Sequence, residues 1–130
     1  MAKTKRFDLP PARTNADYLQ ILSIAKDGVP YDLTGCTFRM ELREVGDYSG
    51  GSPLITLATV TTLVEGVGIW GDPTVGQIIL IIARATLAGV MTTAIARKRT
   101  WYDLRITTPA TTRDAPCAGE LPIEWGATRG

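Results

Sequence analysis

The chain has 130 residues and contains no histidine. Histidine is the commonest general base near neutral pH and the commonest metal ligand, so its absence removes the Ser-His and Cys-His nucleophile systems. There is no Walker-type loop, and the glycine-rich residues 66–71 (GVGIWG) precede a turn instead of opening a helix. The 13 acidic residues show no spacing that selects a carboxylate pair for glycoside hydrolysis. The sequence therefore predicts a protein that is not an enzyme and needs no cofactor or metal.

Cysteine is also scarce, with only Cys36 and Cys117 in the chain. Two cysteines are too few for a disulfide framework or for a zinc site built from cysteines. They either pair with each other, if the fold brings them together, or remain small buried hydrophobic side chains in a reducing compartment. We favour the second interpretation.

Neither a strong net charge nor a long apolar run is present. The 14 basic and 13 acidic residues give a net charge of +1, so no global field attracts DNA or an anionic membrane. The most apolar run, residues 77–83, is far shorter than the ~20 residues of a membrane-spanning helix. Residues 1–6 are basic but no apolar stretch follows them, as a secretory signal would require. We expect a protein kept in solution, with neither nucleic acid nor membrane as its partner.

What the chain does contain is a repeated strand pattern with 45% apolar residues, enough for one domain with a real core. Residues 36–44 alternate strictly, with Cys36, Phe38, Met40 and Leu42 on one face and Thr37, Arg39, Glu41 and Arg43 on the other. Such a period of two places one face on a core and the other in water. Further strands are expected at residues 17–26, 53–61, 67–70, 77–83, 100–107 and 118–125, and one or two helical turns within residues 84–96.

This pattern predicts an all-β fold of about seven strands with one short helical crossover, which is typical of a β-sandwich. A small barrel is the alternative. The run at residues 77–83 is expected to be a central strand covered on both faces. Residues 108–116 are expected to form a turn, and Pro122 should lie at a sheet edge or a bulge because it lacks a ladder donor.

The N-terminal segment has a different composition, and we expect an extended arm at residues 1–16 followed by the sandwich domain at residues 17–130. Pro10 and Pro11 cannot lie inside a helix or a central strand. Such a segment usually frays unless something holds it, which suggests that it docks on a neighbouring protein. Deleting residues 1–15 should then leave a folded domain that no longer enters its assembly.

The arm and the segment around Trp101 supply the candidate contact residues. Trp101 is expected to point away from the core, and an exposed tryptophan beside arginines is more typical of a protein contact than of a sugar platform. The basic residues 97–99 are interpreted as a solvated strand entry and not as a phosphate site. The predicted partner-binding residues are Lys3, Lys5, Arg6, Phe7, Leu9, Arg13, Trp101, Arg97 and Arg99. A carbohydrate-binding face that uses Trp70, Trp101 and Trp125 is the alternative.

Residues 32–35 (DLTG) are interpreted as a structural turn. Leu33 can fill the core while Asp32 or Thr34 caps the turn, and Gly35 supplies a backbone angle that other residues resist.

Several segments together resemble the immunoglobulin-like N-terminal domain of tailed-phage baseplate upper proteins and related phage virion proteins. They are residues 18–43, which contain DGVPYDLTG followed by CTFRMELR, then residues 54–57 (LITL), 76–80 (GQIIL), the Ala/Thr-rich turn at 85–93 and 101–107 (WYDLRIT). The resemblance extends from about Asp17 to Trp125. The family's upper proteins continue into a long fibre-anchoring region, whereas this sequence stops at Gly130.

The resemblance implies an immunoglobulin-like β-sandwich that serves as a structural protein of a tailed-bacteriophage virion. Such a protein would connect or anchor fibres or spikes at the tail or baseplate through contacts with other virion proteins. We expect it to be homo-oligomeric or present in many copies, and to be assembled into the virion in the host bacterial cytoplasm. A capsid-decorating protein on the head is the alternative within this class. Family members are structural, so no catalytic residues are carried over.

Overall fold

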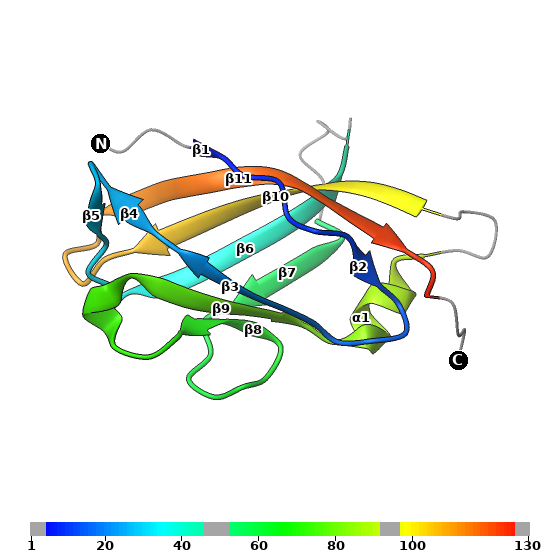
Figure 1. Ribbon diagram of the computed structural model, residues 1–130, viewed down its shortest axis with the longest axis horizontal. Coiled ribbons are helices and arrows are strands. Elements are labelled where there is room, and N and C mark those ends of the chain that lie inside the picture. Colours follow the sequence, from blue (N-terminus) through cyan, green and yellow to red (C-terminus); the bar gives the residue numbers. More distant parts are fainter. Residues whose placement is uncertain (1–4, 46–52, 92–96, 127–130) are drawn as a thin grey trace.

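Two β-sheets face each other in the computed structural model of the chain, which describes residues 5–45, 53–91 and 97–126 (Figure 1). Sheet A contains, in spatial order, β1 (Lys5–Arg6), β11 (Arg113–Glu124), β10 (Arg97–Thr107), β6 (Thr37–Glu44) and β7 (Ile55–Ala58), and β2 (Ala12–Arg13) also pairs with β11. Sheet B has the order β3 (Tyr18–Ser23), β9 (Gln77–Ile82) and β8 (Gly66–Ile69). The strands β4 (Ala25–Lys26) and β5 (Val29–Pro30) form a separate hairpin. The predicted all-β class is confirmed.

The longer strands fall on the predicted segments. β3 and β6 to β11 correspond to the expected strands, while the additional β1, β2, β4 and β5 have two residues each. The helix α1 (Arg84–Gly89) follows β9 in sheet B and precedes β10 in sheet A, so the predicted helical crossover is confirmed. Residues 92–96 of that crossover lie outside the described residues. A short 3-10 turn, η1 (Pro73–Val75), joins β8 to β9.

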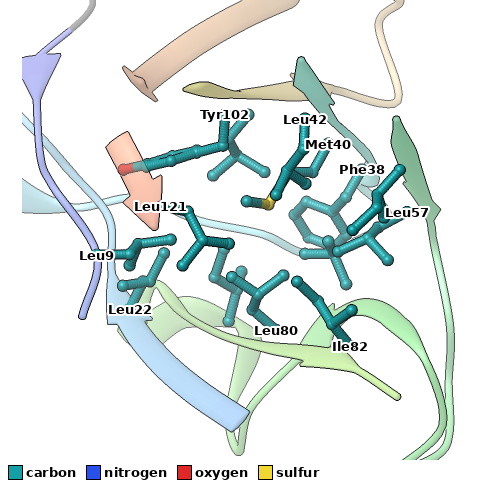
Figure 2. Packing of buried hydrophobic residues seen from close by; sticks show 14 of the residues in the cluster. Leu9, Leu22, Phe38, Met40, Leu42, Leu57, Leu80, Ile82, Tyr102 and Leu121 are labelled. Carbon is teal, nitrogen blue, oxygen red and sulfur yellow. The ribbon is translucent and has the colours of Figure 1, made fainter. Parts of the chain in front are cut away.

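The core lies between the sheets, and in β6 and β10 the buried residues alternate with more exposed ones so that one side of each strand faces it. The buried members of β6, which include Met40 and Leu42, face inward from sheet A, and Leu80 and Ile82 of β9 face inward from sheet B. Figure 2 shows these side chains meeting in the space between the two layers. The alternation read from the sequence therefore assigns the correct inner face to the strands that it marks most clearly.

β9 is buried on its outer side as well as on its inner side. Ile79 and Ile81 are buried although their register partners include the exposed Leu19 and Ile21 of β3 and the glycines of β8. Side chains at residues 66 and 68 would collide with Val60, which occupies this space. The prediction of a central strand covered on both faces is thus confirmed, and a loop residue covers part of the outer face.

The turn at residues 32–35 has the predicted geometry. Leu33 is fully buried, and Asp32 accepts hydrogen bonds through Oδ1 from the backbone N–H of Thr34 at 3.0 Å and from its hydroxyl at 2.7 Å. Gly35 has φ +71°, and a Cβ there would collide with Pro109. The structural interpretation of this motif is therefore confirmed.

Two expected boundaries are wrong. The expected strand at residues 17–26 is divided into β3 and β4, and the turn at Asp27 and Gly28, with φ values of 54° and 79°, closes a hairpin between β4 and β5. The expected turn at residues 108–116 is shorter, since β11 begins at Arg113. A register shift opposite Leu104 and Ile106 forms a bulge that accommodates Pro116, which has no N–H for the ladder.

The expected division into an arm at residues 1–16 and a domain from residue 17 is wrong for the described part of that arm. β1 and β2 both pair with β11 in parallel, and the N–H groups of Phe7 and Leu9 donate to backbone carbonyls of β11 at 2.9 and 2.8 Å. The segment therefore forms the outer border of sheet A beside β11 (Figure 1). Pro122 lies in β11 between the residues that pair with β1 and those that pair with β2, where the parallel ladder is interrupted.

Side chains hold the N-terminal segment in place at three points. The hydroxyl of Tyr102 donates to the carbonyl of Phe7, and the hydroxyl of Tyr18 donates to the carbonyl of Pro10 at 2.7 Å. Leu9 is buried, and Figure 2 shows its side chain directed between the sheets toward Leu22 and Leu121. These contacts are those of an integral strand and not of a separate arm.

Cys36 and Cys117 are both buried and free, as expected for small hydrophobic side chains, and the reducing compartment stays a prediction. Burial raises the pKa of each thiol above its ordinary value. Neither thiol is therefore activated as a nucleophile.

Candidate interaction surface

The outer face of sheet A carries the exposed tryptophan that the sequence pattern predicts. In β10 the inward residues Thr100, Tyr102 and Leu104 are buried, and Trp101 points to the opposite side with 36% of its surface exposed. Register pairing places Glu120 of β11 on one flank of Trp101 and Arg43 of β6 on the other. We call the surface formed by Arg6, Asp8, Arg43, Arg97, Arg99, Trp101 and Glu120 the Trp101 face.

Arg6 ties the N-terminal segment to the centre of this face. Its guanidinium carbon lies 5.2 Å from the centroid of the Trp101 ring, within the range of a cation-π contact. The same guanidinium forms an ion pair with Asp8 at 3.1 Å. Asp8 also accepts a hydrogen bond from the backbone N–H of Glu120 at 3.0 Å. That backbone hydrogen bond, followed by the one from Arg6, lowers the pKa of the Asp8 carboxyl below its usual value.

The arginines around Trp101 are paired with carboxylates of the same sheet. Arg99 forms an ion pair with Glu120, and Arg97 and Arg13 both lie 3.8 Å from carboxylate oxygens of Glu124. Exposed ion pairs of this kind contribute only about 0–1 kcal/mol to stability, so they do not explain the fold. They do neutralise the basic residues 97–99 in part, which favours the solvated-strand interpretation over a phosphate site.

On β6 and the far end of β10 the same pattern continues. Glu41 accepts from Arg39 at 2.8 Å and from Arg43 at 3.3 Å, and the hydrogen bond from Arg39 is the main cause of its lowered pKa. Arg105 pairs with Asp103 at 3.2 Å. The surface around the tryptophan therefore carries charges of both signs that are paired with one another.

The structure brings some of the predicted contact residues together and separates others. Arg6, Arg97, Arg99 and Trp101 share the outer face of sheet A, and Arg13 lies at its end beside Glu124. Lys5 and Phe7 instead line a cleft at the lateral edge of the sandwich.

The prediction that Leu9 contacts a partner is wrong, because only 4% of the residue is exposed and its side chain belongs to the core. Lys3 lies outside the described residues.

Three residues of the face, Asp8, Arg43 and Glu120, were not among the predicted partner-binding residues. The alternation of residues 36–44 already placed Arg43 on a polar side. Asp8 and Glu120 come from opposite ends of the chain and meet only because the N-terminal segment pairs with β11. In the sequence of residues 120–125 (ELPIEW), Leu121 and Ile123 alternate with Glu120 and Glu124, which puts Glu120 on a polar side of the strand. No local signal indicated that Asp8 would join it.

The tryptophans do not form one platform. Trp101 lies on the outer side of sheet A, whereas Trp70 directly follows β8 of sheet B, with 38% of its surface exposed. Trp125 is partly buried against the core. A sugar platform made of Trp70 and Trp101 is therefore not supported, since the two rings belong to different layers.

Within the described residues no group of three or more metal-ligating side chains comes together. No helix among those residues has the length and apolar character needed to cross a membrane. No protein-family model matches the chain, and no curated protein matches it significantly.

Proposed function

We propose that this protein is a structural component of a tailed-bacteriophage virion, an immunoglobulin-like domain that joins parts of the tail or baseplate to fibres or spikes. The proposal combines the resemblance of residues 17–125 to phage baseplate proteins with the strand order and the Trp101 face. It assigns the protein a role in contacts with other virion proteins and no catalytic role.

The strand order supports the immunoglobulin-like part of the proposal. Sheet A carries β11-β10-β6-β7, and sheet B carries β3-β9-β8. In chain order these correspond to the G-F-C-C′ and B-E-D strands of a variable-type immunoglobulin sandwich. The parallel pairing of β1 and β2 with β11 adds the first strand to the same sheet as the last.

The observation that carries the contact role is the exposed Trp101 stacked with Arg6 at the centre of a charged sheet face. Tryptophan and arginine dominate the residues whose removal weakens protein interfaces most. A ring surrounded by ion pairs provides an apolar centre with a polar rim, which is the usual composition of such an interface.

The test is the incorporation of a Trp101→Ala variant into particles of a phage that lacks its own copy of the gene. Loss of an interface tryptophan costs about 2 kcal/mol or more, so the bound fraction at limiting concentration should fall roughly 30-fold. The copy number per purified particle is measured by quantitative mass spectrometry. Trp70→Ala is the matched control, because Trp70 has similar exposure but belongs to the other layer.

Both variants must first show the circular dichroism spectrum and melting temperature of the unmodified protein. The proposal expects Trp101→Ala to be depleted from particles and Trp70→Ala to be incorporated normally. Equal incorporation of the two variants at the level of the unmodified protein would refute the contact role of the Trp101 face.

A further inference from the structure

The two edge strands of sheet B, β8 and β3, differ in whether other backbone groups cover their outer edges. The outer edge of β8 is covered, since Thr59 bridges to Val67 and the N–H of Val60 donates to the carbonyl of Val67 at 3.0 Å. The outer edge of β3 has no such cover, because β3 ends the sheet and no other backbone group of the described residues bonds to Tyr18–Ser23. The N-terminal segment that could have paired with β3 pairs with β11 instead.

β3 also lacks the features that normally protect an edge strand. Its sequence, YLQILS, contains no charged residue and no proline, and its pairing with β9 runs through all six residues without a bulge. Leu19 and Ile21 expose 52% and 46% of their surfaces on its outer side. Natural proteins protect exposed edges with charges, prolines or bulges, so an unprotected apolar edge is a template for pairing with another strand.

A cleft opens beside this edge. It has a volume of about 550 Å³ and lies between Lys5 and Phe7 on one wall and residues 21–25 on the other. The remaining lining residues are Asp27, Tyr31, Asp114, Pro116 and Cys117. Phe7 exposes 47% of its surface here. The cleft lies where β1 borders sheet A and β3 borders sheet B, and none of the strands in the described part of the chain pairs with both of these edges.

We propose that the β3 edge and this cleft together bind an extended segment of another protein, which adds to sheet B as a fourth strand. Strand addition supplies main-chain hydrogen bonds to the free edge, and alternate side chains provide specificity. In such a strand, every second side chain enters the cleft against Phe7 and the others lie beside Ile21. The side chains of the partner segment that enter the cleft against Phe7 are therefore expected to be apolar, which places apolar residues at every second position.

A second copy of the chain fits this site less well than an extended segment. If β3 of one copy paired with β3 of another, its inward residues Tyr18 and Leu22 would remain packed in their own core and leave the cleft empty. A free extended segment satisfies the backbone edge and the cleft at the same time. This inference does not depend on the virion proposal, because it concerns a different surface and its test uses the purified protein alone.

The experiment is a selection from a yeast-displayed library of random nonapeptides against the full chain, followed by affinity measurement with the best synthetic peptide. The expected peptides alternate apolar and polar residues and bind the Ile21→Lys and Phe7→Ala variants at least tenfold more weakly. Leu63→Lys is the matched control, since it places the same charge at another exposed apolar position of the chain, and it should bind normally. Peptides that are N-methylated on the pairing edge should not bind.

Amide hydrogen exchange provides the direct readout of strand addition. In the complex, alternate amides of Tyr18–Ser23 that exchange quickly in the free protein should become protected. Three outcomes would overturn the proposal. They are no enrichment of peptides with period two, equal binding to all three variants, and a wild-type dimer that Ile21→Lys converts to a monomer in sedimentation analysis. The last result would assign the edge to a second copy.

Discussion

Replacing Leu9 by alanine tests whether the N-terminal segment is part of the sandwich. Leu9 is 4% exposed and packs in the core cluster with Leu22 and Leu121 (Figure 2). Truncation of a buried leucine to alanine lowers the free energy of unfolding by about 2–5 kcal/mol, because the lost transfer free energy is added to the cost of the cavity. For a domain of this size we convert this to a fall in melting temperature of about 8–20 °C.

Phe7→Ala is the matched control in the same segment. Phe7 is 47% exposed, so its truncation removes less buried area and leaves an open surface in place of a cavity. We expect this substitution to lower the free energy of unfolding by roughly 1 kcal/mol. Both values are obtained from urea unfolding followed by tryptophan fluorescence, with the m-value checked for a common two-state transition.

An integral N-terminal strand is refuted if the free energy of unfolding of Leu9→Ala lies within about 0.5 kcal/mol of that of the unmodified protein, which is the range of neutral surface substitutions. A separable arm would give that result, and deletion of residues 1–15 would then leave the domain intact. The integral strand predicts instead that the deletion exposes the edge of β11 and lowers stability even more than Leu9→Ala does.

Two further predictions concern the contacts that hold the same segment. Gly119→Ala should destabilise the fold by about 1–3 kcal/mol in urea unfolding, because a Cβ there overlaps the carbonyl of Phe7. The Gly89→Ala control lies in α1 with open space around it and should be neutral or slightly stabilising, since alanine is the better helix residue. Burial raises the pKa of Tyr18 and of Tyr102 above the ordinary value. Their neutral hydroxyls therefore contribute stability that is fully present below about pH 10, and this stability is lost as the pH rises toward the raised pKa values of the folded protein. Absorbance at about 295 nm should therefore show these phenols ionising together with alkaline unfolding, and their ionisation near pH 10 in the folded protein would contradict the assignment.

Much of the fold could be predicted because strict alternation records burial directly. β6 was assigned with the correct inner face, Trp101 of β10 was placed on the outer side, and Leu33 and Gly35 were given their roles in the turn. In each case the local residues alone determine the result, since a period of two or a positive φ leaves few alternatives.

The N-terminal segment could not be predicted, because its partner is more than a hundred residues away. Pro10 and Pro11 correctly excluded a central strand, but a short parallel border interrupted at those prolines has no local signature. Leu9 therefore looked like an exposed contact, and the meeting of Asp8 with Glu120 was missed. Trp101 was placed on the right face because its strand alternates, whereas the stacking of Arg6 on it depends on that same distant pairing.

The most direct test of the proposed function is cryo-electron microscopy of purified phage particles with focused classification on the tail and the head. The account predicts density for the two-sheet domain at the tail or baseplate, with a neighbouring protein covering Trp101 and Arg6. Density over the capsid lattice would replace the tail assignment by a decorating role. Absence of the protein from particles, or a Trp101 face open to solvent in every copy, would contradict the proposal.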